Sequence, residues 1–262
     1  MKNLFLAVLF LSVSGFSFAQ DGPSATWAKN KVVVDGNANE WNLPLKNYDN
    51  TTGLFFDFEN DSTHLYLCFQ TKYEINESRI MRAGMKIILS NKINGKHKSV
   101  IIYPLPASKI PKQKDEIQPD PMAPHESRHA AFLEKDTLME VKGFTTKNGM
   151  ISTRDTAGIH AAINWDSAKV FTYEIAIPLK EMFGDNYDLK DLSKEISLDV
   201  VISATPADNV KNREEESDYS EREGSRTGGG RMGGQGGGQY QGNRQAMFPK
   251  TELKQKFVLA NK

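Results

Sequence analysis

The first strong structural signal in the chain is the stretch Val32-Val33-Val34-Asp35-Gly36-Asn37-Ala38-Asn39-Glu40-Trp41. Its β-branched run favours a strand. The Asp-Gly pair that follows supplies a tight turn, because glycine reaches positive φ without a steric penalty. We therefore expect residues 31–35 to open a β-domain, with the large indole of Trp41 closing one edge of it.

Similar short runs of Val, Ile, Phe and Tyr recur between turn signals along the rest of the chain, which favours a sandwich over βαβ units. The sequence predicts an all-β fold: a two-sheet β-sandwich of about ten strands. In one of them Tyr66, Cys68 and Gln70 alternate with Leu65, Leu67, Phe69 and Thr71, so one face can pack on a core. Short helices are expected at 74–84 and 178–183. The predicted strands are 31–35, 53–59, 65–71, 85–90, 99–103, 139–145, 159–165, 171–177, 196–204 and 256–260.

The N-terminus has the pattern of a secretory leader. Lys2 precedes an apolar stretch over 4–18, and small residues lead to Ala19. We predict a signal peptide over 1–19, cleaved after Ala19, and a lead-in over 20–30. The apolar stretch is too short to span a bilayer. The mature protein is therefore expected in the periplasm or outside the cell, with no membrane span.

Charge and cysteine content narrow the function classes. The chain has 33 Lys and Arg against 33 Asp and Glu, so no basic excess is present to recruit nucleic acid. The single cysteine, Cys68, cannot form an internal disulfide. Stability must then come from core burial, and the oligomeric state stays open.

The composition changes abruptly over 208–247, where a charge run leads into a glycine-rich tract. Such composition predicts a disordered segment. A strand-like pattern follows it, so we interpret the tract as a long insertion. The expected sandwich domain thus covers 31–207 and is completed by a closing strand within 248–262.

Three landmarks carry a resemblance to a known family: Val34-Asp35-Gly36 with Glu40-Trp41, the turn and strand of 60–67, and Tyr173-Glu174-Ile175-Ala176-Ile177-Pro178-Leu179. Their order is similar to that in family-9 carbohydrate-binding modules and the related DOMON-like domains. The resemblance spans about 32–202 together with the closing strand. It implies a β-sandwich that binds sugars or, in some relatives, haem or metal ions, without catalysis of its own.

The resemblance makes a polysaccharide or cell-surface glycan the expected partner, since such modules stack aromatic faces on pyranose rings. Trp165, at a predicted strand end, is the better candidate for a ligand-binding ring, and Trp41 is the second. The family's own binding positions find no clear counterparts in this chain. We predict an exported, non-catalytic binding module.

Two alternatives stay open. His125-Glu126-Ser127-Arg128-His129 matches the zinc-hydrolase pattern, in which His125 and His129 would bind zinc while Glu126 activates water. The segment follows a proline-rich loop and lacks a third ligand, which argues against this metal-dependent hydrolase. A haem-binding electron-transfer domain is the other alternative, with Met81 or Met85 paired to His97, His129 or His160.

Carboxylates provide the remaining candidates. Asp35, Asp57 and Asp61 could supply oxygen ligands to calcium, although no EF-hand spacing is present. Asp57 and Glu59 share one face of a predicted strand, as the acid and base of a glycosidase could. No serine, cysteine or lysine nucleophile signature accompanies them.

Overall fold

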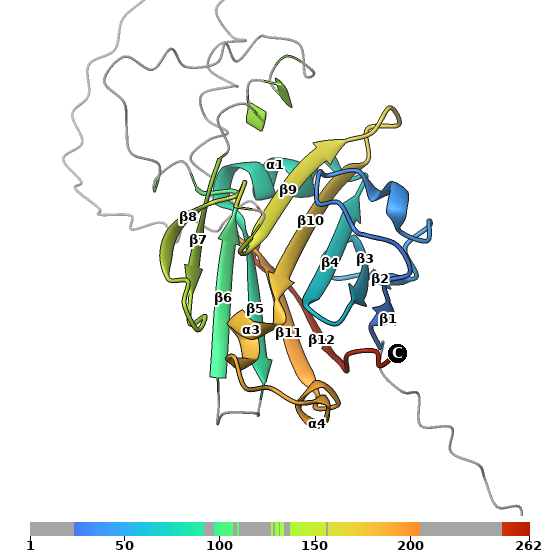
Figure 1. The fold of residues 1–262 in the computed structure, drawn as a ribbon. Coiled ribbons are helices and arrows are strands. Elements are labelled where there is room, and N and C mark those ends of the chain that lie inside the picture. The colour runs from blue at the N-terminus through green and yellow to red at the C-terminus, as the bar shows by residue number, and fades with distance from the viewer. Residues whose placement is uncertain are drawn as a thin grey trace, which may run out of the picture.

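The computed structural model describes residues 24–91, 97–106, 109, 127, 129–130, 132–133, 137–155, 157–204 and 248–262. Two six-stranded sheets pack face to face (Figure 1), which confirms the predicted β-sandwich. The predicted leader over 1–19 and the whole predicted insertion over 208–247 lie outside the described residues. No helix in the described ranges is long and apolar enough to cross a membrane.

Sheet A contains the N-terminal strands and the middle of the chain. Its order is β1-β3-β4-β10-β9, and β2 also pairs with β3. β1 runs parallel to β3, whereas the other pairs described in this sheet are antiparallel. The strands are β1 (Thr26–Trp27), β2 (Asn47–Asp49), β3 (Leu54–Asn60), β4 (His64–Thr71), β9 (His160–Trp165) and β10 (Phe171–Pro178).

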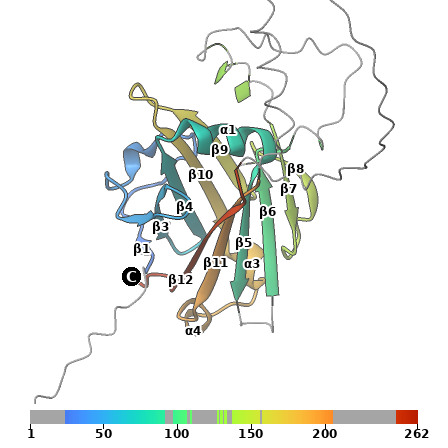
Figure 2. The same cartoon turned by 180° about the vertical axis from the view of Figure 1, so that it is seen from behind.

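Sheet B is antiparallel in the order β12-β11-β5-β6-β7-β8, and Figure 2 shows it from behind. The closing strand is present, but it lies earlier than predicted. Beyond this strand, two hydrogen bonds join Ala260 to Asn60. The Ala260 N–H donates to Asn60 Oδ1 at 2.7 Å, and Asn60 Nδ2 donates to the Ala260 carbonyl at 3.0 Å. The strands are β5 (Met85–Asn91), β6 (His97–Tyr103), β7 (Leu138–Lys142), β8 (Gly149–Ser152), β11 (Ile196–Ile202) and β12 (Thr251–Phe257).

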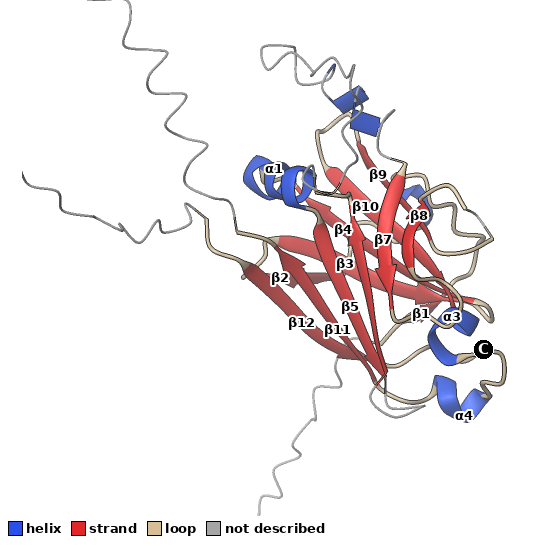
Figure 3. Cartoon of the chain, turned by 90° about the vertical axis from the view of Figure 1, so that its left-hand side faces the viewer, coloured by secondary structure: helices blue, strands red, loops and turns tan. Residues whose placement is uncertain are grey.

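Short helices cap the sandwich. The two predicted helices are present as α1 (Glu74–Ala83) and α3 (Leu179–Phe183). The structure also contains a 3-10 turn, η1 (Ala38–Glu40), and a further short helix, α4 (Leu189–Leu192). α1 lies at one end of the sandwich and α3 and α4 lie at the other (Figures 1 and 3). α1 ends at Gly84, whose φ of +74° a residue with a side chain rarely adopts.

The main core fills the space between the sheets. Every second side chain of β4 points into it, as the alternation predicts, and Leu65, Leu67 and Phe69 are fully covered. Aromatic rings bridge the two sheets. Phe58 of β3 stacks on Phe257 of β12 with ring centroids 4.5 Å apart, which explains why the closing strand matters to the core.

The predicted opening strand over 31–35 is wrong. These residues belong to a segment, which we name the strap (residues 28–45), that crosses the outer face of sheet A without pairing as a strand. The alternation is nevertheless real: Val32 and Val34 are each 8% exposed and Val33 is 48% exposed. The buried side chains pack on Tyr66, Cys68 and Ala176 of the sheet, so the valine run covers a sheet instead of extending one.

Candidate functional site

Glu174 of β10 anchors the strap to the outer face of sheet A. Its side chain is fully buried. Oε1 accepts a hydrogen bond from the Trp41 indole Nε1 at 2.7 Å, and Oε2 accepts from the backbone N–H groups of Gly36 at 2.9 Å and Asp35 at 3.2 Å. The first and third sequence landmarks therefore meet in space, and one carboxyl group joins them.

The Glu174 carboxyl group titrates far from its usual range. Burial raises its pKa from 4.5 to about 7, the donors on Trp41, Gly36 and Asp35 oppose the rise, and the charge of Glu40 adds to it. The folded state thus binds this proton more tightly than the unfolded chain does. The stability that Glu174 contributes is fully present below about pH 4.5 and is lost as the pH rises through 7.

We expect this one group to lower the free energy of unfolding by up to about 3 kcal/mol between pH 4.5 and pH 8. Urea unfolding across that range would measure it, with Glu174→Gln as the control, because the amide keeps the shape and does not titrate. Other carboxyl groups contribute equally to both proteins. A wild-type pH profile parallel to that of the variant would contradict the prediction.

Trp41 is 5% exposed, and η1 and the strap place its ring against the sheet. Trp165 of β9 packs against the main core, and one face of its indole is covered by His129, with centroids 3.6 Å apart and planes 11° apart. The ligand-binding role assigned to these two indoles stays a prediction. The Trp41 ring is buried, and one face of the Trp165 ring is occupied by His129.

His129 contributes to packing and to an ion pair. Its Nε2 lies 2.9 Å from Glu77 Oε1 of α1, and both side chains are largely buried. His125 and Glu126 lie outside the described residues, so the predicted zinc pair stays a prediction. Within the described part of the chain, no group of three His, Cys, Asp or Glu side chains lies close enough together to hold a metal ion.

The other predicted metal and haem residues are dispersed. Met85 is fully buried in the main core, and Met81 packs against its edge. His160 is half-buried, and burial lowers its pKa. Of His97 only the backbone is described. These positions bring no methionine and histidine together among the contacts described.

The acid pair of β3 lies on the outer face of sheet A. Asp57 and Glu59 are 5% and 8% exposed, and the Lys46 ammonium lies 3.9 Å from Asp57 Oδ2. Burial, followed by the charge of Asp57, raises the pKa of Glu59. Both carboxylates are thus largely covered, without the open access that a glycosidase pair needs.

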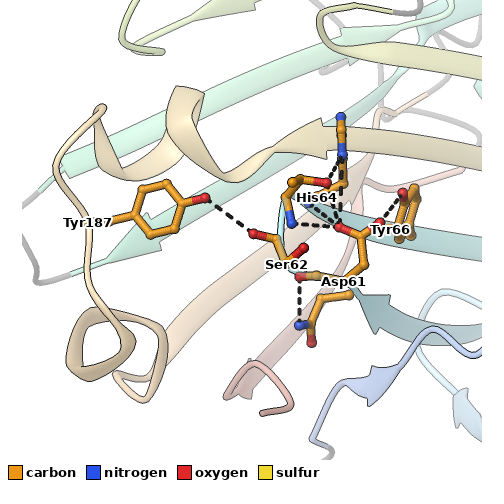
Figure 4. A network of polar contacts seen from close by, with 7 residues as sticks. Asp61, Ser62, His64, Tyr66 and Tyr187 are labelled. Carbon is orange, nitrogen blue, oxygen red and sulfur yellow. Dashed lines mark hydrogen bonds and ion pairs between the residues drawn. The ribbon is translucent and has the colours of Figure 1, made fainter. Parts of the chain in front are cut away.

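Asp61 organises the turn between β3 and β4 (Figure 4). Its Oδ1 accepts from the N–H groups of Thr63 and His64 at 2.6 and 2.7 Å, and its Oδ2 accepts from the Tyr66 hydroxyl at 2.8 Å. Burial raises the pKa of Asp61, but these donors and the Thr63 hydroxyl lower it by more, so the pKa lies below its usual range. Its oxygens serve the turn, which accounts for this landmark in structural terms.

Exposed aromatic rings gather elsewhere, in what we name the aromatic patch (Tyr48, Phe55 and Tyr73). Tyr48 of β2 faces Phe55 of β3, with ring centroids 4.6 Å apart. The neighbouring Tyr73, at the start of α1, raises the pKa of Tyr48, and the Tyr73 ring lies against Gly53 of the β2–β3 turn. The three side chains are 41%, 38% and 53% exposed, so their rings meet at the surface.

Hydrogen bonds hold the patch in place. Asp49 Oδ2 accepts from the Thr52 N–H and hydroxyl, both at 2.7 Å, and Asn76 Nδ2 donates to the Thr52 carbonyl at 2.7 Å. These contacts tie the β2–β3 turn to α1. The Tyr73 N–H donates to Thr71 Oγ1 at 3.2 Å, so the backbone of this residue is held from the β4 side as well. Such preorganisation reduces the entropy lost on binding.

A polar row continues from the patch across sheet A. Phe55 pairs with Gln70, Gln70 with Thr172, and Thr172 with Asn164. The half-buried Gln70 amide donates to Thr172 Oγ1 at 3.0 Å, which orients it beside Phe55. Aromatic faces next to an oriented amide are groups that can contact both the carbon face and the hydroxyl groups of a sugar.

Sequence reasoning missed the patch because it considered tryptophans alone. The signal was present in the turn residues over 49–53, which place Tyr48 and Phe55 on facing positions of a hairpin. Tyr73 joins them only through the fold.

A scan against protein-family models finds no match, and searches of the curated proteins and of the solved structures find none either.

Proposed function

We propose that this protein is an exported, non-catalytic carbohydrate-binding module that resembles the family-9 and DOMON-like group. The observation that supports this most directly is the aromatic patch: three rings, each more than a third exposed, of which Tyr48 and Phe55 are in contact and Tyr73 lies against the turn that joins their strands. Contiguous exposed apolar surface on a soluble domain is typical of an interaction site.

The chemistry of the patch favours a sugar. Tyrosine combines a flat apolar face with a hydroxyl group, and Gln70 adds an amide beside Phe55. Pyranose rings present the matching combination of carbon faces and hydroxyl groups. The candidate carboxylates, in contrast, serve as structural acceptors or are largely covered, as described for Glu174, Asp61 and Asp57.

Affinity electrophoresis in gels that contain xylan, hydroxyethylcellulose, laminarin or mannan tests the proposal. We expect at least one neutral polysaccharide to retard the wild-type protein. Tyr73→Ala should weaken that binding by about 2 kcal/mol, or about thirtyfold in Kd, because a buried aromatic contact dominates small interfaces. Tyr48→Ala should have a similar effect.

Leu43→Ala is the matched control, because Leu43 is 53% exposed, as Tyr73 is, and lies in the strap. It should leave the retardation unchanged. Failure of every polysaccharide to retard the wild type would overturn the proposal, and so would equal losses in Leu43→Ala and Tyr73→Ala.

A further inference from the structure

The outer face of sheet B, shown in Figure 2, carries a second candidate site on the strands β5, β6 and β7. A groove of about 540 Å³ opens there. Val100 and Ile102 of β6 are half-buried and form an apolar floor. Residues that line the groove include Lys86, Lys98 and Lys142.

The three lysines give the groove a positive charge. Lys98 and Lys142 are exposed and Lys86 is half-buried, and within the described residues none of them has a carboxylate partner. The groove also contains Glu140, but this carboxylate forms an ion pair with Lys109. The net charge available to a ligand is therefore positive.

The strand register sets the spacing of these charges. On β5, Lys86 pairs with Ile102 of β6, and on β7, Lys142 pairs with Val100 of β6. Lys98 lies on β6 itself, two residues before Val100. With strands about 4.8 Å apart and a rise of about 3.3 Å per residue, the Cα atoms of the three lysines are separated by about 8–14 Å. The three charges are thus distributed along the groove, and a chain with repeated charges can match this distribution.

The remaining half of the same face argues against a nucleic acid duplex. Asp199 on β11 and Glu252 on β12 lie there, with Glu195 beside them, and nearby lysines pair with Glu252 and Glu195, so this half adds no unpaired positive charge for a broad polyanion. A single anionic sugar chain can follow the groove on β5 to β7 alone. Its ring carbons would contact Val100 and Ile102 while its carboxylates approach the lysines.

From the unpaired lysines, their spacing and the apolar floor, we propose that this groove binds an anionic polysaccharide bearing carboxylate groups along its length. The groove lies on the opposite sheet from the aromatic patch, so the two sites are independent. Binding here is expected to weaken as salt is added, because exposed charges are screened.

Affinity electrophoresis in gels containing polygalacturonate tests this proposal, with mobilities referred to polymer-free gels. The wild type should be retarded, and the triple variant Lys86→Gln, Lys98→Gln, Lys142→Gln should lose at least tenfold in apparent affinity. Tyr73→Ala should bind polygalacturonate as the wild type does, which separates this site from the aromatic patch.

A second triple variant is the matched control: Lys250→Gln, Lys254→Gln, Lys256→Gln removes the same charge from lysines of β12 and its start that already pair with Glu252 and Glu195. It should keep wild-type affinity. The proposal is overturned if the wild type is not retarded, if both triple variants lose affinity equally, or if a duplex DNA competes as well as free polygalacturonate does.

Discussion

Glu174→Ala is expected to lower the free energy of unfolding by about 4 kcal/mol at pH 7, because two buried donors and one partly buried donor lose their acceptor. These donors are the Trp41 indole N–H and the backbone N–H groups of Gly36 and Asp35. No other acceptor is described for them, and the alanine side chain supplies none. Urea unfolding followed by tryptophan fluorescence would measure the loss.

Two further variants distinguish the effect of losing the hydrogen-bond acceptor from the effect of losing side-chain volume. Glu174→Gln keeps one acceptor oxygen and should lose clearly less stability than alanine does. Trp41→Phe removes a single donor but keeps most of the ring, so about 1–2 kcal/mol is expected from the unpaired acceptor and the smaller side chain. If Glu174→Ala were no more destabilising than Trp41→Phe, the strap would not depend on the carboxyl group.

Arg79→Ala should cost about 3–5 kcal/mol, since it removes a buried guanidinium that serves three carbonyl groups. Arg79 in α1 is 5% exposed and donates to the carbonyls of Ile202 at 3.1 Å, Ser203 at 3.1 Å and Pro249 at 2.7 Å. Ile202 is the last residue of β11, Ser203 follows it, and Pro249 lies just before β12. The Arg79 side chain therefore links the two segments that flank residues 205–247 in the sequence.

Arg82→Ala is the control on the same helix, because Arg82 is exposed and its loss should change stability by less than about 0.5 kcal/mol. Arg79→Lys keeps the charge but offers a point donor in place of a planar fork, so we expect an intermediate loss. Equal stability of the Arg79→Ala and Arg82→Ala variants would show that the three carbonyl contacts contribute nothing.

The fold class was predictable because strand periodicity depends on local alternation. β3, β4, β5 and β10 lie within one or two residues of the predicted ranges, as their inward side chains recur at every second position. β1, β2 and β8 were missed. They have two to four residues each, too few to show a period.

The valine run shows where periodicity is insufficient. The β-branched run favoured a strand, and in the structure Val32 and Val34 pack against the sheet while Val33 is exposed, without a strand being formed. Whether an extended segment joins a ladder or crosses over a sheet depends on which backbone groups lie beside it. Here Glu174, distant in sequence, takes the N–H groups of the turn.

At the aromatic patch and at the lysine groove, too, local sequence determined one part of the surface and tertiary structure the other. Local sequence determined the hairpin that sets Tyr48 beside Phe55, and it determined the alternation that turns Lys98, Val100 and Ile102 outward. The tertiary structure decided the rest. It brought Tyr73 to the hairpin, buried the indole of Trp41 and left three lysines without a carboxylate partner among the described residues. Accessibility and charge pairing depend on neighbours that the order of residues does not specify.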